Sequence, residues 1–214
     1  MRYLIVCGGK IDKEFGLNEI KTDGIDAIIA ADSGMDFLYE NGVTPDIIVG
    51  DFDSTTTNAL EYFERKGQTE IRRLNPIKDD TDTEYAIRLA ISEGARSIVL
   101  LGATGSRIDH VLGNISLLGI GLESGTDISI IDTNNRIRMA DKPVTIEKSA
   151  QYGRFVSLIA LTDDNEVSLK GFKYPVTDYS FDRFTSLGIS NEIIDDYAVI
   201  DIHRGKFIII ESKD

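Results

Sequence analysis

The sequence of 214 residues has one cysteine, no tryptophan and no long hydrophobic run. A lone cysteine excludes a disulfide framework and a cysteine-rich metal site, and we expect Cys7, inside an apolar run, to be a small buried core residue. That opening run covers only Tyr3 to Cys7, whereas a signal peptide needs about 7–15 apolar residues and a membrane span about 20. We therefore expect a cytoplasmic protein with no membrane partner.

Basic residues are also scarce. Lys and Arg total 23 against 36 Asp and Glu, for a formal net charge of −13, and the basic residues are scattered. Nucleic-acid-binding surfaces concentrate positive charge, so we expect no nucleic-acid partner. A polyanionic substrate would instead require metal ions or a few locally placed Arg and Lys side chains.

The chain does contain two regions of different periodicity. Up to about residue 132, short apolar runs such as IIVG and SIVLL alternate with helical patterns that mostly end in glycine. This alternation predicts a parallel sheet covered by helices on both faces. Further on, runs such as FVSLIAL and KFIIIES are separated by turn residues, which predicts an antiparallel sandwich or barrel. The expected class is α/β, with a three-layer domain over 1–138 and a smaller all-β domain over 139–214.

Acidic and glycine-rich segments follow the predicted strands of the first region. In an open parallel sheet, ligands bind outside the carboxyl ends of the strands. The segments that should meet at this edge contain Asp32, then Asp51 and Asp53, then KDDTDTE, and then GATGSRIDH. This edge is therefore the expected site.

The stretch IIVGDFDSTT places two aspartates one residue apart. On an extended segment Asp51 and Asp53 share a face, and at about 6 Å their charges would repel by roughly 3 kcal/mol at an effective dielectric near 20. One interpretation is that Asp53 or Ser54 caps a helix that begins near Thr56. The other is a divalent cation such as Mg²⁺, which prefers oxygen ligands.

The stretch KDDTDTE favours the cation. Thr81 and Glu84 form a capping box, so a helix should start close to Asp82, and its dipole would tolerate acidic residues there. Capping requires one side chain, yet the stretch has four carboxylates. We therefore favour Asp82 as a direct or water-mediated metal ligand, with Asp32 contributing from a neighbouring strand.

The stretch GATGSRIDHVLGN offers an anion site. Gly102 and Gly105 allow a backbone path that presents amide groups to a phosphate, and Asp109 could cap the following helix. The predicted core stripe of that helix is Val111, Ile115, Leu118 and Leu122. A different face carries Arg107, His110 and Asn114. Spacing alone does not decide whether this face binds a ligand.

A P-loop ending and a G-x-G-x-x-G fingerprint are both missing, which excludes the generic NTPase and dinucleotide classes.

Five segments, taken in order, resemble the thiamine pyrophosphokinase family over Asp32 to Glu192. They are AADSG, GDFDS, KDDTDTE, GATGSRIDHVLGN and SLGISNE. The resemblance implies transfer of a diphosphate group from ATP to the hydroxyl of thiamine, which gives thiamine diphosphate and AMP. It also implies Mg²⁺ and a homodimer whose active sites lie where the α/β domain of one chain meets the β domain of the other. We expect the acceptor oxygen to attack the β-phosphorus, with an aspartate receiving or relaying the proton.

The resemblance also assigns residues. The implied metal ligands are Asp32, Asp51, Asp53 and Asp82. The catalytic set is Asp51, Asp53, Asp82 and Arg107. The residues implied around ATP are Asp32, Lys78, Gly102, Thr104, Gly105, Arg107, Asp109, His110 and Asn114. Ser190 and Asn191 would approach thiamine. Relatives can stack a large aromatic ring on the vitamin; without tryptophan, the candidates are Tyr179, Phe181 and Phe184.

Two alternatives compete with this assignment. A strand followed by D-x-D-S-T is also typical of haloacid dehalogenase-type phosphatases, with Asp51 as nucleophile and Asp53 as acid/base. However, that motif usually ends the first strand of its domain, and here two strands precede it. The other alternative is a non-catalytic nucleotide or thiamine sensor. His203, in a late β segment, is expected to be structural.

Overall fold

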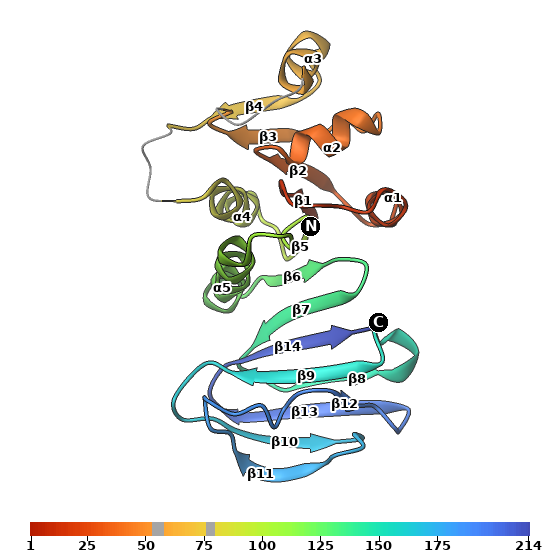
Figure 1. The fold of residues 1–214 in the computed structure, drawn as a ribbon. Helices are drawn as coiled ribbons and strands as arrows, with labels where there is room; N and C mark the ends of the chain where they lie inside the picture. Colours follow the sequence, from red (N-terminus) through yellow and green to blue (C-terminus); the bar gives the residue numbers. More distant parts are fainter. Residues whose placement is uncertain (53–57, 76–79) are drawn as a thin grey trace. The chain divides into compact units, whose positions relative to one another are not determined.

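The structure, a computed structural model, describes residues 1–52, 58–75 and 80–214 (Figure 1). They form two compact units, Met1–Thr133 and Asn134–Asp214. The boundary predicted after residue 138 falls within strand β7 (Asn135–Ala140) of the second unit. Catalysis with ATP and Mg²⁺ in the first part, and thiamine binding with dimerisation in the second, remain predictions.

In the first unit, strands and helices alternate along the chain. The strands are β1 (Arg2–Val6), β2 (Ala27–Ala31), β3 (Ile47–Gly50), β4 (Glu70–Arg73), β5 (Ser97–Leu101) and β6 (Asp127–Ile131). They pair in parallel in the order β6-β5-β1-β2-β3-β4. The helices are α1 (Lys13–Ile20), α2 (Gly34–Glu40), α3 (Ala59–Lys66), α4 (Asp82–Ser92) and α5 (Ile108–Ser124). In Figure 1, α1 and α2 lie on one face of this sheet and α4 and α5 on the other, so the predicted three-layer arrangement is confirmed.

The sheet of the first unit is buried because its strands are nearly continuous aliphatic runs, as parallel strands covered on both faces require. Ile5, Val49 and Leu100, from three of these strands, are all fully buried. Helices α3 and α5 end at Gly67 and Gly125, whose φ angles of 62° and 72° suit glycine. Since all six strands run the same way, the segments that follow them emerge at one edge of the sheet.

Helix α5 differs from its predicted packing. Of the predicted core stripe, Leu118 is buried, whereas Val111, Ile115 and Leu122 are only partly buried. A helix that is apolar on most of its surface has no single core face, so the stripe could not be read from spacing alone. With 17 residues α5 is the longest described helix, and none of the described helices is long and apolar enough to cross a membrane.

The second unit consists of antiparallel strands, as predicted. One group is ordered β12-β9-β14-β7, with β12 (Asn191–Glu192), β9 (Phe155–Ala160) and β14 (Phe207–Ser212). The other is ordered β11-β10-β13-β8, with β11 (Val176–Ser180), β10 (Glu166–Lys170), β13 (Tyr197–Arg204) and β8 (Val144–Glu147). Both groups contribute to one buried cluster that includes Leu158, Phe207, Val167 and Ile200. A β-sandwich core follows from this alternation of inward apolar residues.

A fully buried carboxylate ties β14 to β7 in the second unit. Glu211 accepts hydrogen bonds from Arg136 Nε and Nη2 at 2.8 and 2.7 Å and from Arg138 Nη2 at 2.9 Å. The backbone N–H of Tyr152 donates to the same carboxylate at 2.9 Å. Such a network is costly to break, because removing the anion leaves its cationic partners uncompensated in a poorly solvated place.

We expect Glu211→Gln to lower the free energy of unfolding by about 3–5 kcal/mol, the range for breaking a buried ion pair. Urea denaturation followed by circular dichroism measures this loss. The matched control is Asp164→Asn, which removes an exposed carboxylate that lies 3.2 Å from Arg204 in the same unit and should change stability little. Equal stability of Glu211→Gln and wild type would contradict the expectation.

Candidate active site

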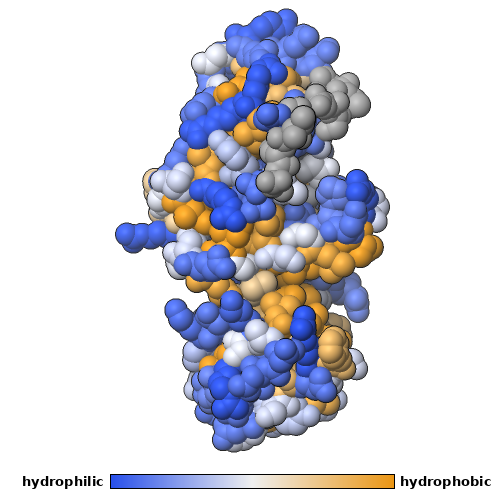
Figure 2. All heavy atoms as spheres, turned by 90° about the vertical axis from the view of Figure 1, so that its left-hand side faces the viewer, coloured by the Kyte–Doolittle hydropathy of each residue, from blue (hydrophilic) through white to orange (hydrophobic). Residues whose placement is uncertain are grey.

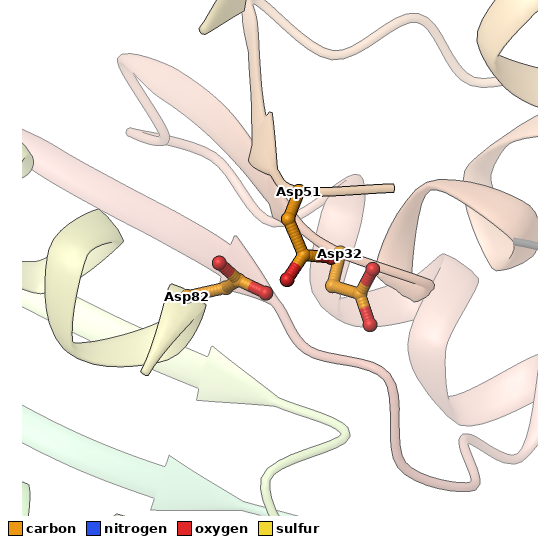
Figure 3. A group of neighbouring side chains, drawn as sticks. All are labelled: Asp32, Asp51 and Asp82. Atoms are coloured by element: carbon orange, nitrogen blue, oxygen red, sulfur yellow. The ribbon is translucent and has the colours of Figure 1, made fainter. Parts of the chain in front are cut away.

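Three carboxylates from separate elements meet at the carboxyl edge of the first unit's sheet. Asp32 follows β2, Asp51 follows β3 and Asp82 is the first residue of α4. Their ligand oxygens all lie within 4.8 Å of one another, and each residue is partly buried. Figure 3 shows the carboxylates of Asp51 and Asp82 pointing toward one another, with Asp32 beside Asp51. Residues that are 50 positions apart in the chain thus form one acidic cluster.

The backbone around the cluster adopts unusual conformations. Asp32 has φ 49° and its N–H donates to the carbonyl oxygen of Val49 at 2.8 Å. Phe52 has φ 63°, which is uncommon for a bulky side chain and typically persists only where the surroundings fix it. The prediction of an extended backbone from Asp51 to Asp53 is therefore wrong at Phe52, whose φ is left-handed. Asp53 itself lies outside the described residues.

Phe52 is held against strand β3. Its side chain is buried, and the Cζ of Arg73 lies 5.4 Å from the centre of its ring. A Cβ on Gly50 would lie 3.0 Å from Phe52 Cε1 and 3.3 Å from Asp32 Cα. Glycine at this position therefore allows the ring and the Asp32 backbone to pack on the end of β3, which fixes the directions in which Asp32 and Asp51 leave the sheet.

Helix α4 begins where the capping box predicted, with the Thr81 half of the box formed. Its N-cap Thr81 accepts a hydrogen bond from the Glu84 backbone N–H through its hydroxyl oxygen at 3.2 Å. The Glu84 carboxylate binds Arg88 one turn later, at 2.9 and 2.7 Å. Since Thr81 supplies the cap, the carboxylate of Asp82 is not required for that purpose and lies in the acidic cluster instead.

The donor set of the cluster fits a hard divalent cation. Two carboxylates about 5 Å apart repel by roughly 3 kcal/mol at an effective dielectric near 20, and a cation between them would offset this repulsion. Oxygen ligands of Mg²⁺ lie about 2.1 Å from the ion, hence at most about 4.2 Å apart. Small side-chain rotations would bring the oxygens of Asp32, Asp51 and Asp82 within that limit.

The cluster opens into a cavity of about 730 Å³, a volume within the usual range for small-molecule sites. All residues that line it belong to the first unit. Besides the three carboxylates, the cavity is lined by these residues of the predicted set: Gly102, Thr104, Gly105, Arg107, His110 and Asn114. The structure therefore brings the acidic and the glycine-rich segments together, as expected for the carboxyl edge of a parallel sheet.

The segment from Gly102 to Gly105 is held in shape by polar contacts. Asn114 Nδ2 donates to the Ala103 carbonyl oxygen at 2.8 Å, and Thr104 Oγ1 donates to Asp132 Oδ2 at 2.9 Å. Asn114 thus supports the loop as well as lining the cavity. Asp132 was missed by the sequence analysis, although its position directly after β6 places it on the same edge of the sheet.

Arg107 and Asp109 form a bidentate ion pair. Nη2 of Arg107 lies 2.6 Å from Oδ2 of Asp109, and Nε lies 3.2 Å from Oδ1. The prediction that Asp109 caps α5 is wrong: the N-cap is Arg107, whose side chain makes no cap bond, and Asp109 lies in the first turn. Asp109 is also not among the residues that line the cavity, so its carboxylate acts on Arg107.

The hydrogen bonds from Arg107 lower the pKa of Asp109 to about 2, from an ordinary value of 3.8. Asp109 therefore stays ionised as the pH falls through 3.8, and the pair is lost only near pH 2. Replacing Arg107 with Gln should raise the pKa of Asp109 toward 3.8, which a ¹³C NMR titration of the carboxyl carbon measures. An unchanged titration curve would contradict a role for Arg107 in holding this carboxylate.

The opening segment of the chain also reaches the cavity, which the sequence analysis missed. Cys7, Gly8, Gly9 and Lys10 follow β1 and all line it. As predicted, Cys7 is buried, and burial raises the pKa of its thiol to about 11, so it is an inert core group. The signal that could have identified Lys10 is its position after the first strand, on the same edge as the aspartates.

The remaining predicted residues lie elsewhere. Lys78 is outside the described residues. Asn191 and Ser190 belong to the second unit, where the buried Asn191 side chain binds both the backbone N–H and the carbonyl of Tyr174, at 3.1 and 2.9 Å. Ser190 has φ 60° and its N–H donates to Ser157 Oγ at 3.0 Å. Their contact with thiamine remains a prediction.

The aromatic candidates differ in exposure. Phe181 is buried between Tyr179 and Phe207, with ring centres 5.2 and 5.8 Å away, so it is a core residue. Phe184 is 89% exposed and Tyr179 is 39% exposed. These two remain the aromatic candidates for contact with a ligand.

Comparison with known proteins gives one consistent result. The family model for the thiamin pyrophosphokinase catalytic domain matches residues 21–130, and that for the thiamin pyrophosphokinase vitamin B1 binding domain matches residues 143–207. A thiamine pyrophosphokinase of Bacillus subtilis is 35% identical over 188 residues, which are 87% of each chain. The crystal structure of thiamine pyrophosphokinase from Bacillus subtilis superposes with a TM-score of 0.89 at 31% identity and covers both chains completely. That of thiamin pyrophosphokinase from Geobacillus thermodenitrificans gives 0.87 at 29% identity, covering 100% of this chain and 98% of the other. The chain belongs to the thiamin pyrophosphokinase family.

Proposed function

We propose that this protein transfers a diphosphate group from ATP to the hydroxyl of thiamine and releases AMP. The observation that carries this proposal is the cluster of Asp32, Asp51 and Asp82 facing the same cavity as the glycine-rich segment from Gly102 to Gly105. Membership of the family over both parts of the chain supports the choice of donor and acceptor.

The acidic cluster would hold Mg²⁺ through Asp32, Asp51 and Asp82, with Asp53 as a further proposed ligand. When bound, the ion would neutralise charge on the transferred group and orient it. The carboxylates themselves favour the positively charged thiazolium ring of thiamine, because an acidic cavity raises the local concentration of a cation. An acidic site and a polyanionic donor are thus compatible.

Transfer of this kind depends mainly on positioning and charge neutralisation. The thiamine oxygen would form a bond to the β-phosphorus while the bond from that phosphorus to the oxygen of the departing AMP breaks. The hydroxyl proton would pass to an aspartate of the cluster, directly or through a water molecule. Arg107 would contact the phosphates after its ion pair with Asp109 opens. Thr104 and His110 line the same cavity.

The two alternatives receive no support. In a phosphatase of the haloacid dehalogenase type, the nucleophilic aspartate would be expected after the first strand of its domain, whereas Asp51 follows the third. The family matches include a vitamin-binding part that a phosphatase would not need. A sensor without turnover differs from the enzyme only in its products, so the decisive observation is chemical.

Product analysis tests the proposal. The purified protein is incubated with ATP, Mg²⁺ and thiamine, and the products are separated by chromatography and identified by ³¹P NMR. We expect equal amounts of AMP and thiamine diphosphate, and no AMP when thiamine is omitted. Inorganic phosphate released from small phosphate esters would support the phosphatase instead. Binding of ATP and thiamine without any product would support the sensor.

A homodimer is the proposed assembly, with the cavity of one chain completed by the second unit of its partner. Hydrophobic residues reach the surface on the face shown in Figure 2. In the first unit, Ile108 and Leu112 of α5 are 65% and 60% exposed; in the second, Phe184 and Leu187 are 89% and 58% exposed. Exposed apolar side chains mark an interaction surface when they form a contiguous patch, and Ile108 and Leu112 lie one turn apart on α5. Sedimentation equilibrium should give twice the mass of one chain; a monomer at assay concentrations would contradict this assembly.

A cytoplasmic location is also proposed. Its support is Cys7, a free and buried cysteine, which is compatible with a reducing compartment. Cell fractionation would test it: thiamine diphosphate formation by this protein should appear in the cytosolic fraction, and recovery in the membrane fraction would contradict the proposal.

A further inference from the structure

We propose that Lys10 binds the polyphosphate of the donor nucleotide. This inference rests on the proposed function for the identity of the donor. Lys10 lies outside both matched family segments, which cover residues 21–130 and 143–207, and outside the sequence motifs described above. Its place in the fold, its neighbours and the charge of the cavity support the assignment.

Lys10 follows β1, the strand at which the strand order of the sheet reverses. From β1 the chain proceeds to β2 on one side, whereas β5 lies on the other side of β1. In open α/β sheets the ligand crevice lies outside the carboxyl ends of the strands where the strand order reverses. The segments that follow β1 and β5 are Cys7 to Lys10 and Gly102 to Gly105, and both line the cavity.

Glycines hold these two segments against each other. The Gly9 N–H donates to the Gly102 carbonyl oxygen at 2.8 Å. A Cβ on Gly9 would lie 2.3 Å from that oxygen and 2.5 Å from the Thr104 carbonyl oxygen, so a larger residue does not fit. Lys10, the next residue, is therefore fixed at its backbone beside the segment that is proposed to receive phosphate, while its side chain is exposed.

A polyphosphate that binds in this acidic cavity requires a cationic side chain that is not already paired with a carboxylate. Among the described residues, the carboxylates that line it are Asp32, Asp51, Asp80 and Asp82, and the permanent cations are Lys10 and Arg107. Arg107 forms the bidentate pair with Asp109. Lys10 forms no hydrogen bond or ion pair with the described part of the chain, so it can contact a phosphate without breaking an existing interaction. A lysine ammonium is a common phosphate-binding group.

Binding measurements test this assignment directly. Titration calorimetry with ATP and Mg²⁺, without thiamine so that no turnover occurs, would be performed on wild type, Lys10→Met and Lys10→Arg. We expect Lys10→Met to weaken ATP binding at least about tenfold, in line with a charge-assisted hydrogen bond, and Lys10→Arg to retain most of the affinity. Binding of adenosine should not change, because it carries no phosphate. The matched control, Lys13→Met, removes an exposed lysine of α1 that does not line the cavity and should bind ATP like wild type.

Steady-state kinetics give a second readout. In Lys10→Met the KM for ATP should rise while the KM for thiamine stays unchanged. Equal ATP affinity in Lys10→Met and wild type would overturn the inference, and so would a parallel loss of ATP and adenosine, which would indicate damage to the loop. If wild type binds ATP in a Lys10-dependent manner but forms no thiamine diphosphate, the proposed function fails while the role of Lys10 stands.

Discussion

Replacement of Asp51 by Asn should reduce the rate of thiamine diphosphate formation by at least about a hundredfold, the scale seen when one preorganised electrostatic group is removed from an active site. The reason is geometric as well as electrostatic: Asp51 lies between Asp32 and Asp82 in the cluster and is fixed by the turn at Phe52. The fold should survive, because removing one of three mutually repelling carboxylates relieves repulsion in the metal-free protein.

Initial rates with saturating ATP and thiamine measure this effect, and thermal unfolding shows whether the fold is intact. The matched control is Asp127→Asn, the same chemical change at the first residue of β6, at the amino end of a strand and therefore at the opposite edge of the sheet. It should retain normal turnover. If Asp51→Asn kept turnover close to that of wild type, the assignment of the acidic cluster would be wrong.

Removal of divalent metal should abolish turnover, and added Mg²⁺ should restore it. The same ion should raise the Tm of the wild type, because a ligand that binds only the folded state stabilises it, by about 2.7 kcal/mol at a hundred times its Kd. Mg²⁺ should raise the Tm of Asp51→Asn much less, since the variant has lost one of the three clustered carboxylates. These measurements separate metal binding from catalysis.

A chelator-treated enzyme that works at full rate would rule out a metal requirement. An equal Tm increase in wild type and Asp51→Asn would show that the ion binds elsewhere. Asp127→Asn, which keeps the cluster, should respond to Mg²⁺ like wild type and so controls for a general effect of the ion on an acidic chain.

Much of the fold could be predicted because its signals are local. Single strands alternating with helices predicted the parallel sheet, and turn-separated β runs predicted the antiparallel second unit. The Thr81 capping box predicted the start of α4 at Asp82. The packing of α5 was not predictable, since an apolar helix offers more than one face and only the neighbouring elements decide which one is buried.

The site was predicted in part. Asp32, Asp51 and Asp82 were expected on one edge, and the structure places their oxygens within 4.8 Å. The left-handed turn at Phe52 was not expected, because its stability comes from packing on Gly50 and under Arg73 and not from local preference. Lys10 and Asp132 were missed because a single charged residue after a strand has no distinctive spacing.

The sequence by itself determined the order of the elements, the edge of the sheet on which the acidic and glycine-rich segments emerge, and the family. These depend on periodicity and capping over a few residues. Only the tertiary structure decided which of those side chains meet, that Asp109 holds Arg107 and that Lys10 joins the cavity. Such contacts link residues far apart in the chain, and their distances are set by strand order and by close glycine packing, which no local pattern encodes.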